Sequence, residues 1–230
     1  MTDFVLVHGG WHGAWCWTFV VDELAARGHR AIAVDLPAED LTAGAAEYAE
    51  AVLAALPGDD AVVVGHSLAG LVLPLVAVAR PVRHLVYLAA MLPEPGRSVA
   101  GGDRQTVRGL GRGQVRHADG STSWEPAAAI DRLYPDCPPE RAAWAAARLR
   151  RQHWRVMDEV TPLTAWPDVP STYVRCAADA VIDADWAARA VPERLGVQPV
   201  ILPGDHSPLL SRPAELAELL AGPATPTSTA

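Results

Sequence analysis

The chain has 230 residues, half of them hydrophobic, and a formal net charge of −8 at pH 7. This length and apolar content suffice for one well-filled core. We therefore expect a single α/β domain over residues 1–222 that carries an insertion, followed by a disordered tail over 223–230. The acidic balance argues against a nucleic-acid partner. All 19 basic residues are arginine, and the lack of lysine excludes Schiff-base catalysis and a Walker-type phosphate site.

The cysteines, the hydropathy and the N-terminus bear on metal binding and on the cellular compartment. Cys16, Cys137 and Cys176 are widely spaced without metal-like pairing, so buried thiols are expected rather than a metal centre. No apolar run approaches the ~20 residues of a membrane span, and the chain begins without the features of a signal peptide. We expect a cytoplasmic protein that does not bind membranes. Its oligomeric state, monomer or homodimer, is left open.

Strand-like and helical segments alternate along the first ninety residues, with short connections between them. This alternation predicts a parallel sheet that helices cover on both faces. Pro74 lies within the third helix and should bend it, because proline removes one backbone donor. The predicted strands are 4–7, 30–36, 61–66 and 84–92, and the predicted helices are 14–27, 43–56 and 68–79.

Residues 93–165 break this rhythm with proline- and glycine-rich loops and two helical patches at 127–133 and 140–154. An insertion that follows a sheet strand is typical of a lid over an active site. Its aromatic residues favour packing over a loose surface excursion, so we predict a small helical lid. Strands 171–176 and 199–204 then complete a mostly parallel sheet of six strands, with helices at 183–194 and 208–220.

The run AVVVGHSLAG, residues 61–70, predicts a buried strand, a sharp turn and the start of a helix. Ser67 occupies the turn between the small residues Gly65 and Ala69, an arrangement typical of a nucleophile elbow. Such a turn could instead simply connect a strand to a helix. A catalytic role is favoured because an acid and a histidine follow in the chain order that this architecture requires.

The partners of this serine are expected at the carboxyl ends of late strands. Asp179 follows the strand that begins at Ser171 and is the predicted acid, whereas Asp183 and Asp185 fall where a helix should begin and suit its N-terminal turn. His206 follows the last strand and is the predicted base. Its neighbour Asp205 is too close in sequence to orient the imidazole easily.

An oxyanion hole needs two backbone N–H groups. The residue after the nucleophile, Leu68, supplies one, and Gly10 in the glycine-rich loop after the first strand is predicted to supply the other. A loop of this kind could also cradle a nucleotide phosphate. However, the loop has no GxGxxG pattern, and Trp11 would obstruct the phosphates, so a dinucleotide site is discounted.

Taken together, VLVHGGWHGAWCW (residues 5–17), GHSLAG (65–70), CAAD (176–179) and DHSP (205–208) resemble the α/β-hydrolase family of plant methylesterases and hydroxynitrile lyases and its bacterial relatives. The resemblance covers nearly the whole chain and is weakest in the lid. It implies an α/β-hydrolase fold, and it implies a catalytic triad and an oxyanion hole at the same positions: Ser67, Asp179, His206, Gly10 and Leu68.

The resemblance also bears on the reaction. Lyase members carry threonine where this chain has Gly9 and lysine where it has Ser207, so we predict serine-dependent hydrolysis of small methyl, alkyl or aryl esters through an acyl-enzyme, without cofactor or metal. A lyase or cyclase on the same fold, or a non-catalytic small-molecule receptor, remains the alternative. Trp11, Met91 and Leu92 are predicted to line an apolar substrate pocket.

Overall fold

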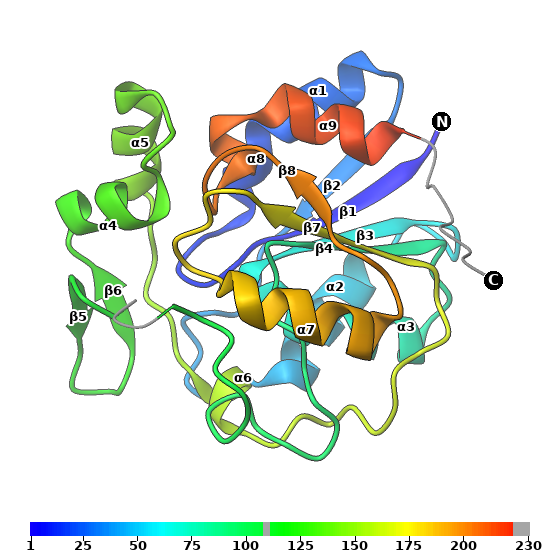
Figure 1. Cartoon of the computed structure of the whole chain (residues 1–230), viewed down its shortest axis with the longest axis horizontal. Helices are drawn as coiled ribbons and strands as arrows, with labels where there is room; N and C mark the ends of the chain where they lie inside the picture. The colour runs from blue at the N-terminus through cyan, green and yellow to red at the C-terminus, as the bar shows by residue number, and fades with distance from the viewer. Residues whose placement is uncertain (108–110, 223–230) are drawn as a thin grey trace.

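The computed structural model describes residues 1–107 and 111–222, so the predicted disordered tail at 223–230 lies outside the described residues. Its centre is a parallel sheet of six strands in the order β2-β1-β3-β4-β7-β8 (Figure 1). This sheet confirms the predicted architecture. The strands are β1 (Asp3–Val7), β2 (Arg30–Val34), β3 (Val62–His66), β4 (His84–Leu88), β7 (Ser171–Cys176) and β8 (Val200–Leu202).

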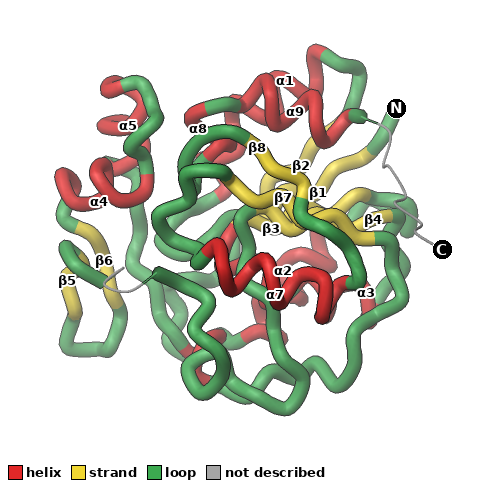
Figure 2. The backbone as a smooth tube through the Cα atoms, in the orientation of Figure 1, coloured by secondary structure: helices red, strands yellow, loops and turns green. Residues whose placement is uncertain are grey.

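Both faces of the sheet are buried, as expected for parallel strands that helices cover on either side. Side chains alternate along β1, so that Val5 and Val7 enter one hydrophobic cluster while Phe4 and Leu6 enter the other. No helix in the described part of the chain is both long and apolar enough to cross a membrane. Figure 2 shows α1 (Thr18–Ala26), α8 (Pro208–Ser211) and α9 (Pro213–Ala221) on one side of the sheet, with α2 (Ala45–Ala55), α3 (Leu73–Ala79) and α7 (Ala184–Leu195) on the other.

Several predicted helices are shorter than the sequence pattern suggested. A 3-10 helix precedes α1 over Ala14–Trp17, and another precedes α3 over Ser67–Leu71. Pro74 therefore lies in the first turn of α3 and does not bend a longer helix, because the N–H that proline lacks has no helical partner there. The predicted C-terminal helix is likewise divided, and its second part begins at Pro213.

The insertion between β4 and β7 contains helices, as the predicted small helical lid requires, but it also contains two strands that were not predicted. It contains an antiparallel hairpin, and its second helix ends at Ala146 instead of continuing to residue 154. Trp124 of the hairpin packs edge-on against Trp11 with ring centroids 5.3 Å apart. The elements are β5 (Gln114–Arg116), β6 (Thr122–Trp124), α4 (Pro126–Leu133), α5 (Pro139–Ala146) and α6 (Arg155–Asp158).

The three cysteines are free and buried, as predicted. Burial raises the pKa of the Cys137 thiol to about 12, and it also raises the pKa values of Cys16 and Cys176. Since thiols react as thiolates, these cysteines are unreactive side chains of the core.

Candidate active site

Ser67 directly follows the central strand β3 and has a left-handed backbone, with φ of 53°. A non-glycine residue in this region costs about 1–2 kcal/mol, so packing must hold the turn in place. Small residues make the turn possible: a Cβ on Gly65 would collide with the side chain of Leu73, and one on Gly70 with the backbone of Met91. The local geometry is that of the predicted nucleophile elbow.

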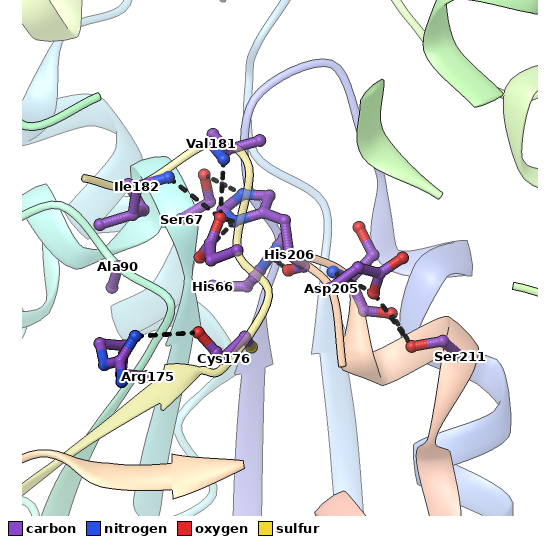
Figure 3. A network of polar contacts seen from close by, with 12 residues as sticks. His66, Ser67, Ala90, Arg175, Cys176, Val181, Ile182, Asp205, His206 and Ser211 are labelled. Carbon is purple, nitrogen blue, oxygen red and sulfur yellow. Dashed lines mark hydrogen bonds and ion pairs between the residues drawn. The ribbon is translucent and has the colours of Figure 1, made fainter. Parts of the chain in front are cut away.

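Hydrogen bonds join the three side chains predicted to form a triad, and Figure 3 shows two of them, Ser67 and His206, next to each other. Nε2 of His206 is 3.0 Å from Oγ of Ser67, and Nδ1 of the same ring is 3.0 Å from both carboxylate oxygens of Asp179. The carboxylate is held in turn by the N–H groups of Val181 and Ile182, at 2.8 and 3.0 Å. With both side chains of the His–Asp pair 3% exposed, the imidazole is fixed in one tautomer and one orientation.

The rival carboxylates have structural roles. Asp183 caps the N-terminus of α7, where its side chain accepts a hydrogen bond from the N–H of Trp186 at 2.8 Å, and Asp185 lies in the first turn. Asp205 accepts from the N–H groups of Ser207 and Asp136 and makes no hydrogen bond to the His206 ring in the described chain. Burial raises the pKa of Asp205.

The peptide between Gly9 and Gly10 is oriented by two histidines. Nδ1–H of His8 donates to the Gly9 carbonyl at 2.8 Å, and the N–H of His12 approaches the same oxygen at 3.4 Å. The peptide is trans, so the N–H of Gly10 is directed away from that oxygen. It donates to no acceptor in the described chain, and Gly10, Leu68 and Ser67 line one cavity. This is the arrangement expected of an oxyanion hole.

His12 orients the next peptide along. Its Nδ1–H donates to the Gly10 carbonyl at 2.7 Å, while its Nε2 accepts from the hydroxyl of Tyr134 in the insertion at 2.8 Å. Burial lowers the pKa of His8 to about 4 and that of His12 to about 3. Both rings therefore stay neutral at physiological pH, as a donor–acceptor pattern of this kind requires.

His66 supports the catalytic histidine, a role that the sequence analysis missed because strand alternation directs this side chain away from Ser67. Its Nε2–H donates to the backbone carbonyl of His206 at 2.8 Å, and the two rings lie 4.7 Å apart. Burial lowers the pKa of His66 well below the usual value. The only sequence signal for these supporting roles was the position of His8 and His12 in the HGGWHG motif and of His66 in the GHS motif.

A cavity of about 430 Å³ opens above the serine. Of the predicted binding residues, Trp11 and Met91 line it and Leu92 does not, because Leu92 is fully buried in the core and bonded through its backbone to Gln105. The remaining wall combines Trp154 and other apolar side chains with several polar ones. Those further apolar residues are Leu68, Met157 and Val181, and the polar ones are Thr106, Gln114, Arg116, Thr122 and Asp158.

Comparison with known proteins identifies the family. The model of the alpha/beta hydrolase family matches residues 4–219, nearly the whole chain. The chain belongs to this family. It is 33% identical to the probable esterase PIR7A of Oryza sativa subsp. indica over 94% of both chains. Two solved structures also resemble this α/β hydrolase over 96% or more of both chains: a pyrethroid hydrolase from Sphingobium faniae JZ-2 (TM-score 0.82, 24% identity) and the methylesterase MES16 of Arabidopsis (TM-score 0.76, 25% identity). At the level of the family, these relatives place the chain among carboxylic ester hydrolases.

Proposed function

We propose that the protein is a serine hydrolase that cleaves carboxylic esters through an acyl-enzyme at Ser67. The observation that carries the proposal is the unbroken hydrogen-bonded line from Ser67 through His206 to Asp179, beside a Gly10 N–H that has no acceptor among the described residues. A non-catalytic receptor would not need the serine in a strained backbone conformation, aligned with a base and an acid.

The geometry supports a two-step reaction. His206 Nε2 removes the proton from Ser67 Oγ as this oxygen attacks the ester carbonyl, and Asp179 stabilises the imidazolium that forms. The N–H groups of Gly10 and Leu68 bind the developing oxyanion. The imidazolium then protonates the departing alcohol, and a water molecule activated by the same histidine hydrolyses the acyl-enzyme.

The cavity favours esters with a bulky apolar group. Its volume of about 430 Å³ is in the range of sites that hold drug-sized molecules. Trp11 and Trp154 pack edge to face with centroids 5.0 Å apart, and both line the cavity with Met91. Among the relatives, one is named for methyl jasmonate and one solved structure for pyrethroids, which fits an apolar substrate of this size.

The test is a panel of methyl and p-nitrophenyl esters that runs from acetate to bulky aromatic acids, combined with a fluorophosphonate label located by mass spectrometry. We expect the highest kcat/KM for the bulky aromatic esters and a label on Ser67. Ser67→Ala should abolish both turnover and labelling. Ser207→Ala is the matched control, because the buried Ser207 Oγ has no hydrogen-bond partner in the described chain and should not be needed. Labelling of another serine, or turnover by Ser67→Ala, would refute the proposal.

Lyase chemistry is disfavoured by the same site. A Cβ on Gly9 would lie 2.8 Å from Cβ of Ser67, so the threonine of the lyase members has no room here without movement of the elbow. Ser207, which replaces their lysine, is fully buried and carries no charge. We therefore expect no release of cyanide from mandelonitrile above the spontaneous rate. Release that depends on Ser67 would move the lyase ahead of the esterase.

A further inference from the structure

We infer that Gln152, a buried side chain of the insertion, is a positioning residue that holds the oxyanion loop in its active geometry. The inference rests on the proposed function, because it assigns Gln152 to the oxyanion hole of the esterase. Unlike the triad and the histidines described above, Gln152 belongs to the insertion between β4 and β7, outside the motifs that predicted the site.

Every polar atom of the Gln152 side chain is used. Oε1 accepts from the N–H of Trp11 at 3.2 Å, and Nε2 donates to the Tyr48 hydroxyl at 2.9 Å and to the carbonyl of His153. The amide orientation is determined by these partners, since the Trp11 N–H can only donate and the His153 carbonyl can only accept. The backbone of Gln152 is fixed as well, by an antiparallel bridge to Thr122 with bonds of 2.9 and 3.0 Å.

The loop that Gln152 contacts cannot hold its own shape. Gly9 and Gly10 are adjacent, and glycine imposes little restriction on φ and ψ. Trp11, which follows them, has a left-handed backbone with φ of 63°. Such a conformation costs about 1–3 kcal/mol and persists only where the surroundings determine it. External contacts must therefore fix the peptides that form the oxyanion hole.

Gln152 acts on the peptide directly after the proposed oxyanion donor. His12 holds the carbonyl side of the Gly10–Trp11 peptide, and Gln152 holds its N–H side. With this plane fixed at both ends, rotation about the Gly10 backbone is blocked and its N–H stays directed into the cavity. A Cβ on Gly10 would lie 3.7 Å from Oε1 of Gln152, so the amide is in contact range of the donor residue itself.

A second buried glutamine provides a matched comparison. Gln105 also bonds through both ends of its amide, accepting from the Leu92 N–H at 2.9 Å and donating to the Leu92 carbonyl at 2.8 Å. Its exposed fraction is 5% against 0% for Gln152, but its side chain makes no hydrogen bond to the oxyanion loop among the described residues. Gln105→Met therefore removes a buried amide of the same kind at a place where only stability should change.

The experiment compares the wild type with Gln152→Met, Gln152→Glu and Gln105→Met, using a p-nitrophenyl ester and an arylboronic acid that forms a tetrahedral adduct with the serine. Loss of one oxyanion donor lowers kcat by about 10²–10³ in other hydrolases. We expect kcat of Gln152→Met to fall by at least about tenfold, and by no more than the ~10²–10³ that complete loss of the donor would cause. The boronate should bind less tightly by a similar factor, while KM changes little. In its protonated form, Gln152→Glu keeps an acceptor for the Trp11 N–H and an O–H donor for the His153 carbonyl, so this variant should retain more of the wild-type kcat than Gln152→Met. Gln105→Met should keep kcat even if its midpoint of unfolding falls.

Each outcome decides the inference. Equal kcat values for Gln152→Met and Gln105→Met, or equal losses for Gln152→Met and Gln152→Glu, would overturn it. If the wild type neither hydrolyses esters nor reacts with the boronate, the proposed function fails, and hydrogen exchange then tests the positioning role without substrate. Exchange in the segment 8–13 should be faster in Gln152→Met than in Gln105→Met. Equal exchange rates in that segment would refute the role of Gln152.

Discussion

Acidification should destabilise the folded chain, because three buried imidazoles remain neutral in it while they take up protons in the unfolded chain. The ordinary pKa of histidine is near 6.5, whereas the folded-state values are about 4 for His8 and about 3 for His12. For a group whose folded pKa is lower, the unfolded state binds more protons, so stability falls as the pH falls below 6.5. The loss continues until the pH reaches the folded-state value, at about 4 for His8.

The magnitude follows from about 1.4 kcal/mol per pH unit for each group. Between pH 7 and pH 5, His8 and His12 each remove about 2 kcal/mol, or about 4 kcal/mol together, from a total that is about 5–15 kcal/mol for a typical domain. The pKa of His66 is also lowered by burial, so this residue adds to the loss. Asp205, whose pKa is raised, acts in the opposite direction, but only as the pH approaches the range in which carboxyl groups titrate.

Urea unfolding at pH 7, 6 and 5, followed by tryptophan fluorescence, measures this loss. His12→Asn keeps a side-chain N–H for the Gly10 carbonyl but cannot be protonated, so its stability should fall by about 2 kcal/mol less than that of the wild type over the same interval. His8→Asn should behave alike. The reasoning is wrong if the wild type loses less than about 1 kcal/mol between pH 7 and pH 5, or if the variants lose as much as the wild type.

Three further predictions concern the site. Ser67→Gly should be more stable than Ser67→Ala by about 1 kcal/mol in urea unfolding, because only glycine accepts the left-handed turn without strain, and an equal or higher stability for alanine would contradict this. Asp179→Asn should lower kcat by about 10⁴ while Asp183→Asn, which preserves the helix cap, should change it little; the reverse order would show that the other carboxylate is the catalytic one. Gly9→Ala should lower kcat far more than Gly10→Ala. The Cβ added at Gly9 would lie 2.8 Å from Cβ of Ser67, whereas the Cβ added at Gly10 would be in ordinary contact with Gln152 and Trp154. Similar kcat values for the two variants would argue against the tight elbow.

The parts of the site that follow directly after strands were predictable from the sequence. Ser67, Asp179 and His206 each come after a strand of a parallel sheet, and the carboxyl ends of such strands meet at one edge. Leu92 illustrates where this reasoning fails. Strand β4 ends at Leu88, and Ala89 has a φ of 44°, so the alternation of side chains cannot be extended beyond it.

Contacts between residues far apart in the sequence were not predictable. Gln152 and Trp11 are separated by 141 positions, and no periodicity or motif connects them. The hairpin β5–β6 was missed for a related reason: its strands have three residues each, too few to show alternation. A segment of this kind takes its conformation from tertiary contacts rather than from local preference.

The contacts between the insertion and the loop after β1 limit how far the insertion of this chain, its cap, could be exchanged for another. The hydroxyl of Thr122 accepts from the indole N–H groups of both Trp11 and Trp154, at 2.9 and 3.0 Å, and the N–H of Arg150 donates to the carbonyl of Trp11 at 2.7 Å. The cap is thus joined to the loop beside the nucleophile by several bonds. A cap transplanted from a relative would have to reproduce these partners as well as its own pocket, so new specificities should arise more readily from substitutions within the cap than from its replacement.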